Sequence, residues 1–178
     1  MVSAMRDRSV HVVVVRHGCA GDKQTWLADD FERPLDEGGI RQAQALAQAL
    51  AAGPVERLVA SPTRRCTQTL EPLAIRLRLA IESFDVLRPD GSILDVLDAE
   101  WQAFDGVVMC THGELMQPLL AAVKEHDVRI VAQPGDDEWL LTKGSAWHLT
   151  FNADGNIVQL RHEAPLPLPG CAAHALSD

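Results

Sequence analysis

A run of four valines, residues 12–15, constrains the fold of this chain more than any other feature of its sequence. An unbroken run of β-branched residues is typical of a strand that is buried on both faces, as in a parallel sheet. The run ends abruptly in Arg16, His17 and Gly18. We therefore expect a buried strand over residues 11–15 that delivers an arginine and a histidine into a glycine turn.

The next part of the chain alternates short apolar runs with longer amphipathic segments. This order is typical of an open, mostly parallel sheet with helices on both faces, an α/β architecture of three layers. A segment rich in Gly, Asp and Pro predicts a loop over residues 17–39, and a loop of that length usually forms a lid or a site. Further strands are predicted over residues 58–60, 80–83 and 106–110. Helices are predicted over residues 40–51, with Asp36 as N-cap, and from Pro62 onward, with Ser61 as N-cap. Two more are predicted over residues 92–104 and from Gly113 onward.

The pattern changes after residue 127. Residues 138–142 and the two halves of the segment 145–163 predict antiparallel strands, the last two joined by a turn from Asn152 to Asn156 that contains an Asp-Gly pair. We expect one domain over residues 1–178, with a core of about 10–162 and an irregular tail over 163–178.

Composition and charge narrow the function classes. Hydrophobic residues make up 47% of the chain, and no apolar run approaches the roughly 20 residues that a membrane span needs. The N-terminal segment also lacks the apolar stretch of a signal peptide, so a soluble, cytoplasmic protein without membrane partners is predicted. A net charge of -9 argues against nucleic acid as a partner. The four cysteines show no Cys-x-x-Cys spacing, which predicts reduced thiols without a zinc site or a disulfide framework. The oligomeric state stays open.

Reactive side chains follow three of the predicted strands. Ligands of open parallel sheets bind outside the carboxyl ends of the strands, so residues at these ends are expected to meet. They are Arg16, His17 and Gly18 after the first strand, Ser61, Arg64 and Arg65 after the second, and Thr111, His112 and Gly113 after the strand at residues 106–110.

Two histidines with two arginines suit phosphoryl transfer. Arginine forks neutralise the charge on the equatorial oxygens, one neutral histidine can attack phosphorus, and a second, protonated one can donate to a non-bridging oxygen. The neighbouring arginines are expected to favour the neutral form of His17. This would explain why an arginine and a histidine stand next to each other here. A metal centre is disfavoured, since arginines repel a cation.

Four motifs, in this order and spacing, resemble the histidine phosphatase superfamily, also called phosphoglycerate mutase-like. They are "VVRHG", "RPLDEGGIRQA", "SPTRRCTQT" and "CTHGE". The resemblance covers roughly residues 10–160. In the second motif, Asp36 stands where the family has threonine. The resemblance implies the family's fold, a metal-independent phosphatase activity and no cofactor.

The resemblance also implies roles for individual residues. Arg16 corresponds to the first phosphate clamp, with Gly18 beside it, and His17 to the nucleophile that becomes phosphohistidine. Arg65 corresponds to the family's second arginine, which leaves the role of Arg64 open. His112 corresponds to the hydrogen-bond donor to phosphate. Its neighbour Gly113 then lets a helix N-terminus approach the anion.

One departure concerns the proton donor for the leaving group. Many members carry a glutamate after the third strand, where this chain has Pro89. Asp90 and Glu114 are the two candidates for the donor, and we favour Glu114. The alternative for Glu114 is a charge that complements the helix dipole. The imidazole of a phosphoramidate and a nucleotide phosphate are good leaving groups, so a substrate of that kind needs less acid help.

The sequence is compatible with several substrate classes. The short chain is similar to small phosphohistidine phosphatases, and "RHGCAGDKQTW" is similar to the histidine phosphatase domain found with some Nudix hydrolases, which implies a small phosphorylated metabolite, a nucleotide or phosphohistidine. A phosphoglycerate mutase and a catalytically impaired phosphate-binding protein are the alternatives. In the long loop, Trp26 and Phe31 are candidate substrate contacts. The alternative is that Trp26 packs the loop onto the core.

Overall fold

Seven strands form one sheet in the part of the chain that the computed structural model describes, residues 9–126, 128–132 and 140–167. The order of the strands across the sheet is β3-β2-β4-β1-β6-β7-β5, and β6 is the strand that runs against its neighbours β1 and β7. The strands are β1 (Val10–Arg16), β2 (Arg57–Ala60), β3 (Ile81–Ser83), β4 (Val107–Thr111), β5 (Arg129–Val131), β6 (Ala146–Phe151) and β7 (Ile157–Glu163).

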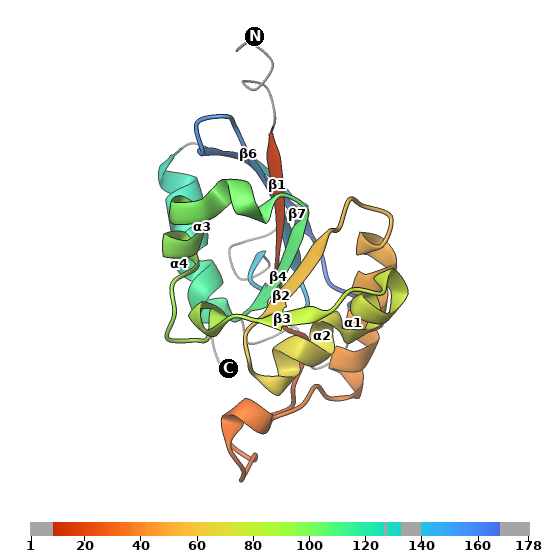
Figure 1. Ribbon diagram of the computed structural model, residues 1–178. Coiled ribbons are helices and arrows are strands. Elements are labelled where there is room, and N and C mark those ends of the chain that lie inside the picture. Colours follow the sequence, from red (N-terminus) through yellow and green to blue (C-terminus); the bar gives the residue numbers. More distant parts are fainter. Residues whose placement is uncertain (1–8, 127, 133–139, 168–178) are drawn as a thin grey trace.

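Helices cover both faces of this sheet, with α1 and α2 on one side and α3 and α4 on the other (Figure 1). The α-helices are α1 (Glu37–Leu50), α2 (Arg64–Leu77), α3 (Ile93–Glu100) and α4 (Gly113–Glu125), and the short 3-10 helices are η1 (Asp30–Glu32), η2 (Asp85–Leu87) and η3 (Trp101–Phe104). The three-layer α/β architecture expected from the sequence is confirmed.

Alternation along the central strands builds a separate core on each face. In β1, Val12 and Val14 pack with the residues of α3 and α4, whereas Val15 packs with those of α1 and α2. In β4, Met109 and Cys110 divide between the two cores in the same way. Successive side chains of a strand point to opposite faces, so a strand between two helix layers must be apolar throughout.

The start of α1 fixes the long loop that follows β1. Asp36 is the N-cap of α1, as predicted, and accepts a hydrogen bond from Gly39 N at 2.8 Å through one carboxylate oxygen. Its other oxygen accepts from Gly21 N at 3.0 Å, and Asp36 N donates to Cys19 O at 3.0 Å. These bonds close the neck of a loop over residues 19–36, which we call the site loop.

Three local predictions were wrong. Helix α2 begins at Arg64 with Thr63 as N-cap, so Ser61 and Pro62 lie outside it. Within the predicted strand at 138–142, residues 138 and 139 lie outside the described residues, and 140–142 do not form a strand. The strand β5 was missed, and it pairs in parallel with β7.

The predicted pair of antiparallel strands is confirmed as β6 and β7, joined by the turn from Asn152 to Asn156. Cys66 and Cys110 are free thiols, as expected, but Cys19 is disulfide-bonded, against expectation. Within the described ranges, no helix is long and apolar enough to cross a membrane.

The close packing of α1 against the site loop predicts a large effect of Gly39→Ala. A Cβ at this position would lie 2.0 Å from the carbonyl oxygen of Cys19, a backbone atom that cannot move without its loop. We expect the free energy of unfolding to fall by about 1–3 kcal/mol, measured by urea unfolding. Gly53→Ala is the control, because its Cβ would meet only Leu50 O at 3.4 Å. Equal stability of the two variants would contradict the packing described.

Candidate active site

Four charged or titratable side chains meet at the carboxyl ends of β1, β2 and β4, as the sequence predicts. Arg16 ends β1 and His17 follows it, Arg65 lies in the first turn of α2, and His112 follows β4. All four are almost completely buried, with exposed fractions of 0 or 1%. The rings of His17 and His112 meet edge to face, with centroids 5.2 Å apart.

The backbone fixes the tautomer of His17. Its Nδ1 lies 2.8 Å from the carbonyl oxygen of Gly18, and a carbonyl can only accept, so Nδ1 carries the proton. In the neutral ring, Nε2 then holds the lone pair. Arg65 Nε donates to this Nε2 at 3.3 Å. The geometry therefore presents Nε2 as a nucleophile toward the space that Arg65 and His112 share.

The structure separates the two neighbouring arginines of α2. Arg65 is buried and points at both histidines, with Nη2 at 3.5 Å from His112 Nδ1. Arg64 is exposed. Successive helical residues point about 100° apart, so only one of them can face the strand ends. Arg65 is thus the residue in the geometry of an anion clamp.

His112 is oriented by Ser61, a contact that the sequence analysis missed by assigning Ser61 to a helix cap. Ser61 is fully buried, and its Oγ lies 2.9 Å from His112 Nε2. The Nη2 of Arg65 can only donate to His112 Nδ1, so in this geometry Nε2 carries the ring proton and Ser61 accepts it. A proton added at Nδ1 would point toward His17 and Arg65, where an anion would accept a hydrogen bond.

Arg16 is held from behind by the backbone. Its Nη1 donates to the carbonyl of Leu141. At Gly113, the first residue of α4, a Cβ would lie 2.9 Å from Arg16 Cζ. The absence of a side chain at Gly113 thus lets the N-terminus of α4 and the guanidinium of Arg16 approach each other, an arrangement that favours anion binding. Gly18 donates its backbone N–H to Thr69 Oγ1 at 3.1 Å.

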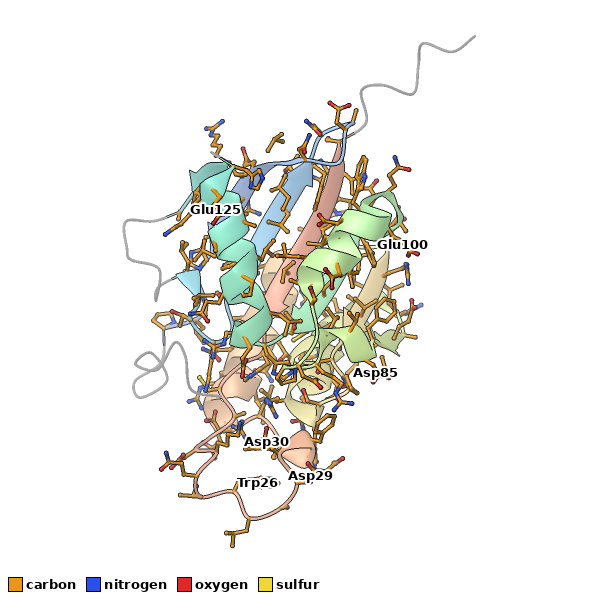
Figure 2. All side chains as sticks on the ribbon, turned by 90° about the vertical axis from the view of Figure 1, so that its left-hand side faces the viewer. Trp26, Asp29, Asp30, Asp85, Glu100 and Glu125 are labelled. Carbon is orange, nitrogen blue, oxygen red and sulfur yellow. The ribbon has the colours of Figure 1, made fainter. Side chains whose placement is uncertain are left out.

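The site loop projects beyond the carboxyl ends of the strands, with Trp26, Asp29 and Asp30 on it (Figure 2). Trp26 is partly exposed and donates its indole N–H to Asp29 O at 3.0 Å, a bond within the loop. Substrate contact by Trp26 stays a prediction. Asp30 contacts Arg65 through an ion pair of 3.2 Å. Asp30 could not be singled out from the sequence, because nothing in a loop sequence shows which carboxylate turns inward.

The two candidate proton donors differ in position. Glu114 is exposed in the first turn of α4, two residues after His112. Asp90 has a side chain that is 78% exposed, and it pairs with Arg88 Nε at 3.4 Å. Glu114 thus belongs to α4, the helix that begins at the site. Its role stays a prediction. Among the described residues, no group of three or more His, Cys, Asp or Glu side chains could hold a metal ion.

Buried histidines and arginines meet at the strand ends of this α/β sheet, a set of donors that suits a phosphoryl anion. The chain matches the model of the histidine phosphatase superfamily (branch 1) over residues 12–89. Together with the site, this match identifies the chain as a member of the histidine phosphatase superfamily.

Comparison with individual proteins agrees with this assignment. An 8-oxo-(d)GTP phosphatase of Mycolicibacterium smegmatis is 32% identical over 160 residues, which cover 86% of this chain and 48% of the relative. The chain thus spans about half the length of that relative.

Solved structures share the fold. The protein histidine phosphatase SixA, in complex with tungstate, has a TM-score of 0.64 and 24% identity, covering 88% of this chain and 96% of SixA. A mycobacterial glucosyl-3-phosphoglycerate phosphatase has a TM-score of 0.59 and 18% identity, covering 88% of this chain and 98% of the other.

The contact between Ser61 and His112 predicts a tautomer that can be observed. In Ser61→Ala the acceptor for Nε2–H is lost, so we expect the free protein to populate both tautomers of His112 instead of mainly the Nε2–H form. The measurement is the ¹⁵N chemical shifts of the ring nitrogens. Thr63→Val is the matched control, because its hydroxyl lies at 3.5 Å from the same nitrogen. An unchanged Nε2–H signal in Ser61→Ala would contradict the role given to Ser61.

Proposed function

We propose that this chain is a metal-independent phosphoric monoester hydrolase that works through a phosphohistidine on His17. The observation that carries the proposal is the tautomer of His17: Gly18 O binds Nδ1 at 2.8 Å, which leaves the lone pair of Nε2 facing Arg65 and His112. A histidine in this state is ready to attack phosphorus, and its surroundings supply the donors that the reaction needs.

The reaction balances in two steps. The bond between phosphorus and the leaving atom, an ester oxygen or the nitrogen of a phosphohistidine, breaks as a bond forms from phosphorus to His17 Nε2. The leaving atom takes a proton from the general acid, for which Glu114 is the favoured candidate. Water then attacks phosphorus and returns a proton to that carboxylate, the N–P bond breaks, and inorganic phosphate leaves. In both steps Arg16 and Arg65 neutralise the equatorial oxygens, and His112, protonated at Nδ1, donates to one of them.

No metal ion is required in this scheme. The electrostatic stabilisation that a divalent cation would give comes from two arginines and a protonated histidine. Placing a cation beside them would add repulsion in a buried site. The donor set around His17 therefore favours an anion over a metal.

The proposed substrate class is a small phosphorylated metabolite, a nucleotide or a phosphohistidine. The nucleotide reading is supported by the likeness to the 8-oxo-(d)GTP phosphatase, and the phosphohistidine reading by the fold shared with SixA. A cytoplasmic location without membrane or nucleic-acid partners belongs to the same proposal. A phosphate-binding protein that has lost its chemistry is the second candidate, favoured by the complete burial of His17 and His112.

The first test is hydrolysis in excess chelator of a panel of phosphates. The panel contains p-nitrophenyl phosphate, a phosphohistidine peptide, nucleoside di- and triphosphates, diadenosine polyphosphates and phosphoglycerates. We expect turnover in the parent chain, and its reduction by roughly a thousandfold or more in His17→Ala. Lys23→Ala, on the exposed part of the site loop, is the control. No turnover by the folded parent on any compound would select the binding protein instead, and isomerisation of phosphoglycerate would select a mutase.

The identity of the proton donor is tested with leaving groups of different quality. If Glu114 protonates the leaving oxygen, Glu114→Gln lowers kcat on an alkyl phosphate by about a hundredfold and changes turnover of p-nitrophenyl phosphate little, because the nitrophenolate leaves without acid help. Asp90→Asn is the matched variant and should change neither rate. The reverse pattern would assign the role to Asp90, and no effect of either variant would exclude both.

A further inference from the structure

Asp30 contacts the anion-binding arginine from the side opposite to the histidines. It is the first residue of η1 in the site loop. Its backbone carbonyl accepts from Arg65 Nη1 at 2.8 Å. Its carboxylate oxygen Oδ2 lies 3.2 Å from Arg65 Nη2. Two different groups of one loop residue therefore bind the same guanidinium.

The two sets of contacts use different edges of the guanidinium. The edge formed by Nε and Nη2 faces the histidines, with Nε at 3.3 Å from His17 Nε2 and Nη2 at 3.5 Å from His112 Nδ1. The end of the guanidinium formed by Nη1 and Nη2 faces Asp30, whose carbonyl accepts from Nη1 and whose carboxylate forms the ion pair with Nη2. A guanidinium is planar and rigid, so fixing one edge fixes the other. Asp30 thus determines where the Nε and Nη2 fork points.

Asp30 is itself held in place by a second buried arginine. Arg33 donates from Nε to Asp30 Oδ1 at 2.7 Å and from Nη1 to Ala20 O at 2.9 Å, and it is only 1% exposed. Phe31, the next residue of η1, lies under the guanidinium of Arg88, 4.7 Å from its ring centroid. The carboxylate of Asp30 is therefore a fixed bridge between two arginines rather than a mobile surface charge.

The contacts of Asp30 with Arg33 and Arg65 argue against a role for Asp30 as the proton donor. Burial raises the pKa of the Asp30 carboxyl, but the hydrogen bond from Arg33 and the charge of Arg65 outweigh it, and the pKa lies below its ordinary value. Asp30 is ionised at neutral pH and does not donate a proton to a leaving group.

We propose that Asp30 is a positioning residue that sets the orientation of Arg65, so that the Nε and Nη2 fork of this arginine meets two oxygens of the phosphoryl group. The inference rests on the proposed function, because it gives Arg65 the phosphate. It adds a residue of the site loop to the phosphate-binding apparatus. The loop therefore determines how well the transferred group is held, in addition to whatever it contacts on the leaving group.

The direction in which Asp30→Ala changes anion binding distinguishes a positioning role of Asp30 from simple charge repulsion of the substrate. A carboxylate beside a phosphate site repels the substrate, so a merely competing Asp30 would make Asp30→Ala bind anions more tightly. A positioning Asp30 predicts weaker binding. We expect Asp30→Ala to lower kcat/KM for p-nitrophenyl phosphate about tenfold and to weaken inhibition by orthovanadate by a similar factor, the size typical of losing a charged contact partner. The bond from Arg65 Nη1 to the backbone carbonyl of residue 30 remains in this variant.

Three further variants make the test specific. Asp30→Asn keeps an oxygen acceptor and should recover part of the loss. Glu32→Gln removes an exposed charge from the same 3-10 helix and should leave both values unchanged. In an Arg65→Ala background, Asp30→Ala should cause no further loss, because its effect passes through Arg65. A residue that only stabilises the fold would give additive losses and a lower melting temperature.

Each outcome has a defined meaning. Tighter orthovanadate inhibition in Asp30→Ala, or additive losses in the double variant, would overturn the positioning role. Unchanged values in a folded Asp30→Ala would also overturn it. If Asp30→Ala does not fold, Asp30→Asn and its double variant carry the same test. Turnover that survives both His17→Ala and Arg65→Ala would instead show that the proposed function is wrong, whatever the Asp30 variants do.

Discussion

Burial of two arginines beside two histidines is the constraint on which the rest of the site depends. A buried guanidinium is strongly destabilising unless it is hydrogen-bonded and partly neutralised. The partners of these guanidiniums include the carbonyls of Leu141 and Asp30 and the carboxylate of Asp30. The Asp30 carboxylate is shared between Arg65 and Arg33, in a chain with a net charge of -9. The guanidiniums gathered at this end of the sheet are donors that suit an anion.

The sequence predicts this gathering because parallel pairing aligns the ends of strands. In the register of the sheet, Arg16 lies opposite Thr111, and Ala60 lies opposite Cys110. The residues that follow each strand are therefore level with one another. A motif placed directly after a buried apolar run can thus be located without a structure. This explains why Arg16, His17 and His112 were placed correctly from the sequence.

Contacts that depend on a helix start or on a loop could not be predicted in this way. The choice between Arg64 and Arg65 depends on the exact rotation of α2, and a shift of its N-cap by two residues, from Ser61 to Thr63, changes the face on which each residue lies. The family resemblance, rather than the helix pattern, selected Arg65. Asp30 turns inward because η1 and Arg33 hold it there, and these are tertiary contacts.

The missed strand and the wrongly predicted one have separate physical reasons. The strand β5 has only three residues, Arg129–Val131, and lies at the sheet edge, so its sequence is too short to show a pattern that marks a strand. Leu140 and Leu141 are buried, as an apolar run should be, but their carbonyls accept from side chains. The carbonyl of Leu140 accepts from Trp147 Nε1, and that of Leu141 accepts from Arg16. Burial was thus predictable here, and backbone conformation was not.

Asp36 connects the departure from the family pattern to the geometry of the site. Its two carboxylate oxygens bind Gly21 N and Gly39 N separately, a division that the single hydroxyl of the family's threonine does not offer. The same residue therefore starts α1 and closes the neck of the site loop. At the tip of that loop, Leu27 is 98% exposed. Since the neck and Asp30 are held by hydrogen bonds, whereas Leu27 is exposed, substitutions at the tip should leave the ion pair between Asp30 and Arg65 in place.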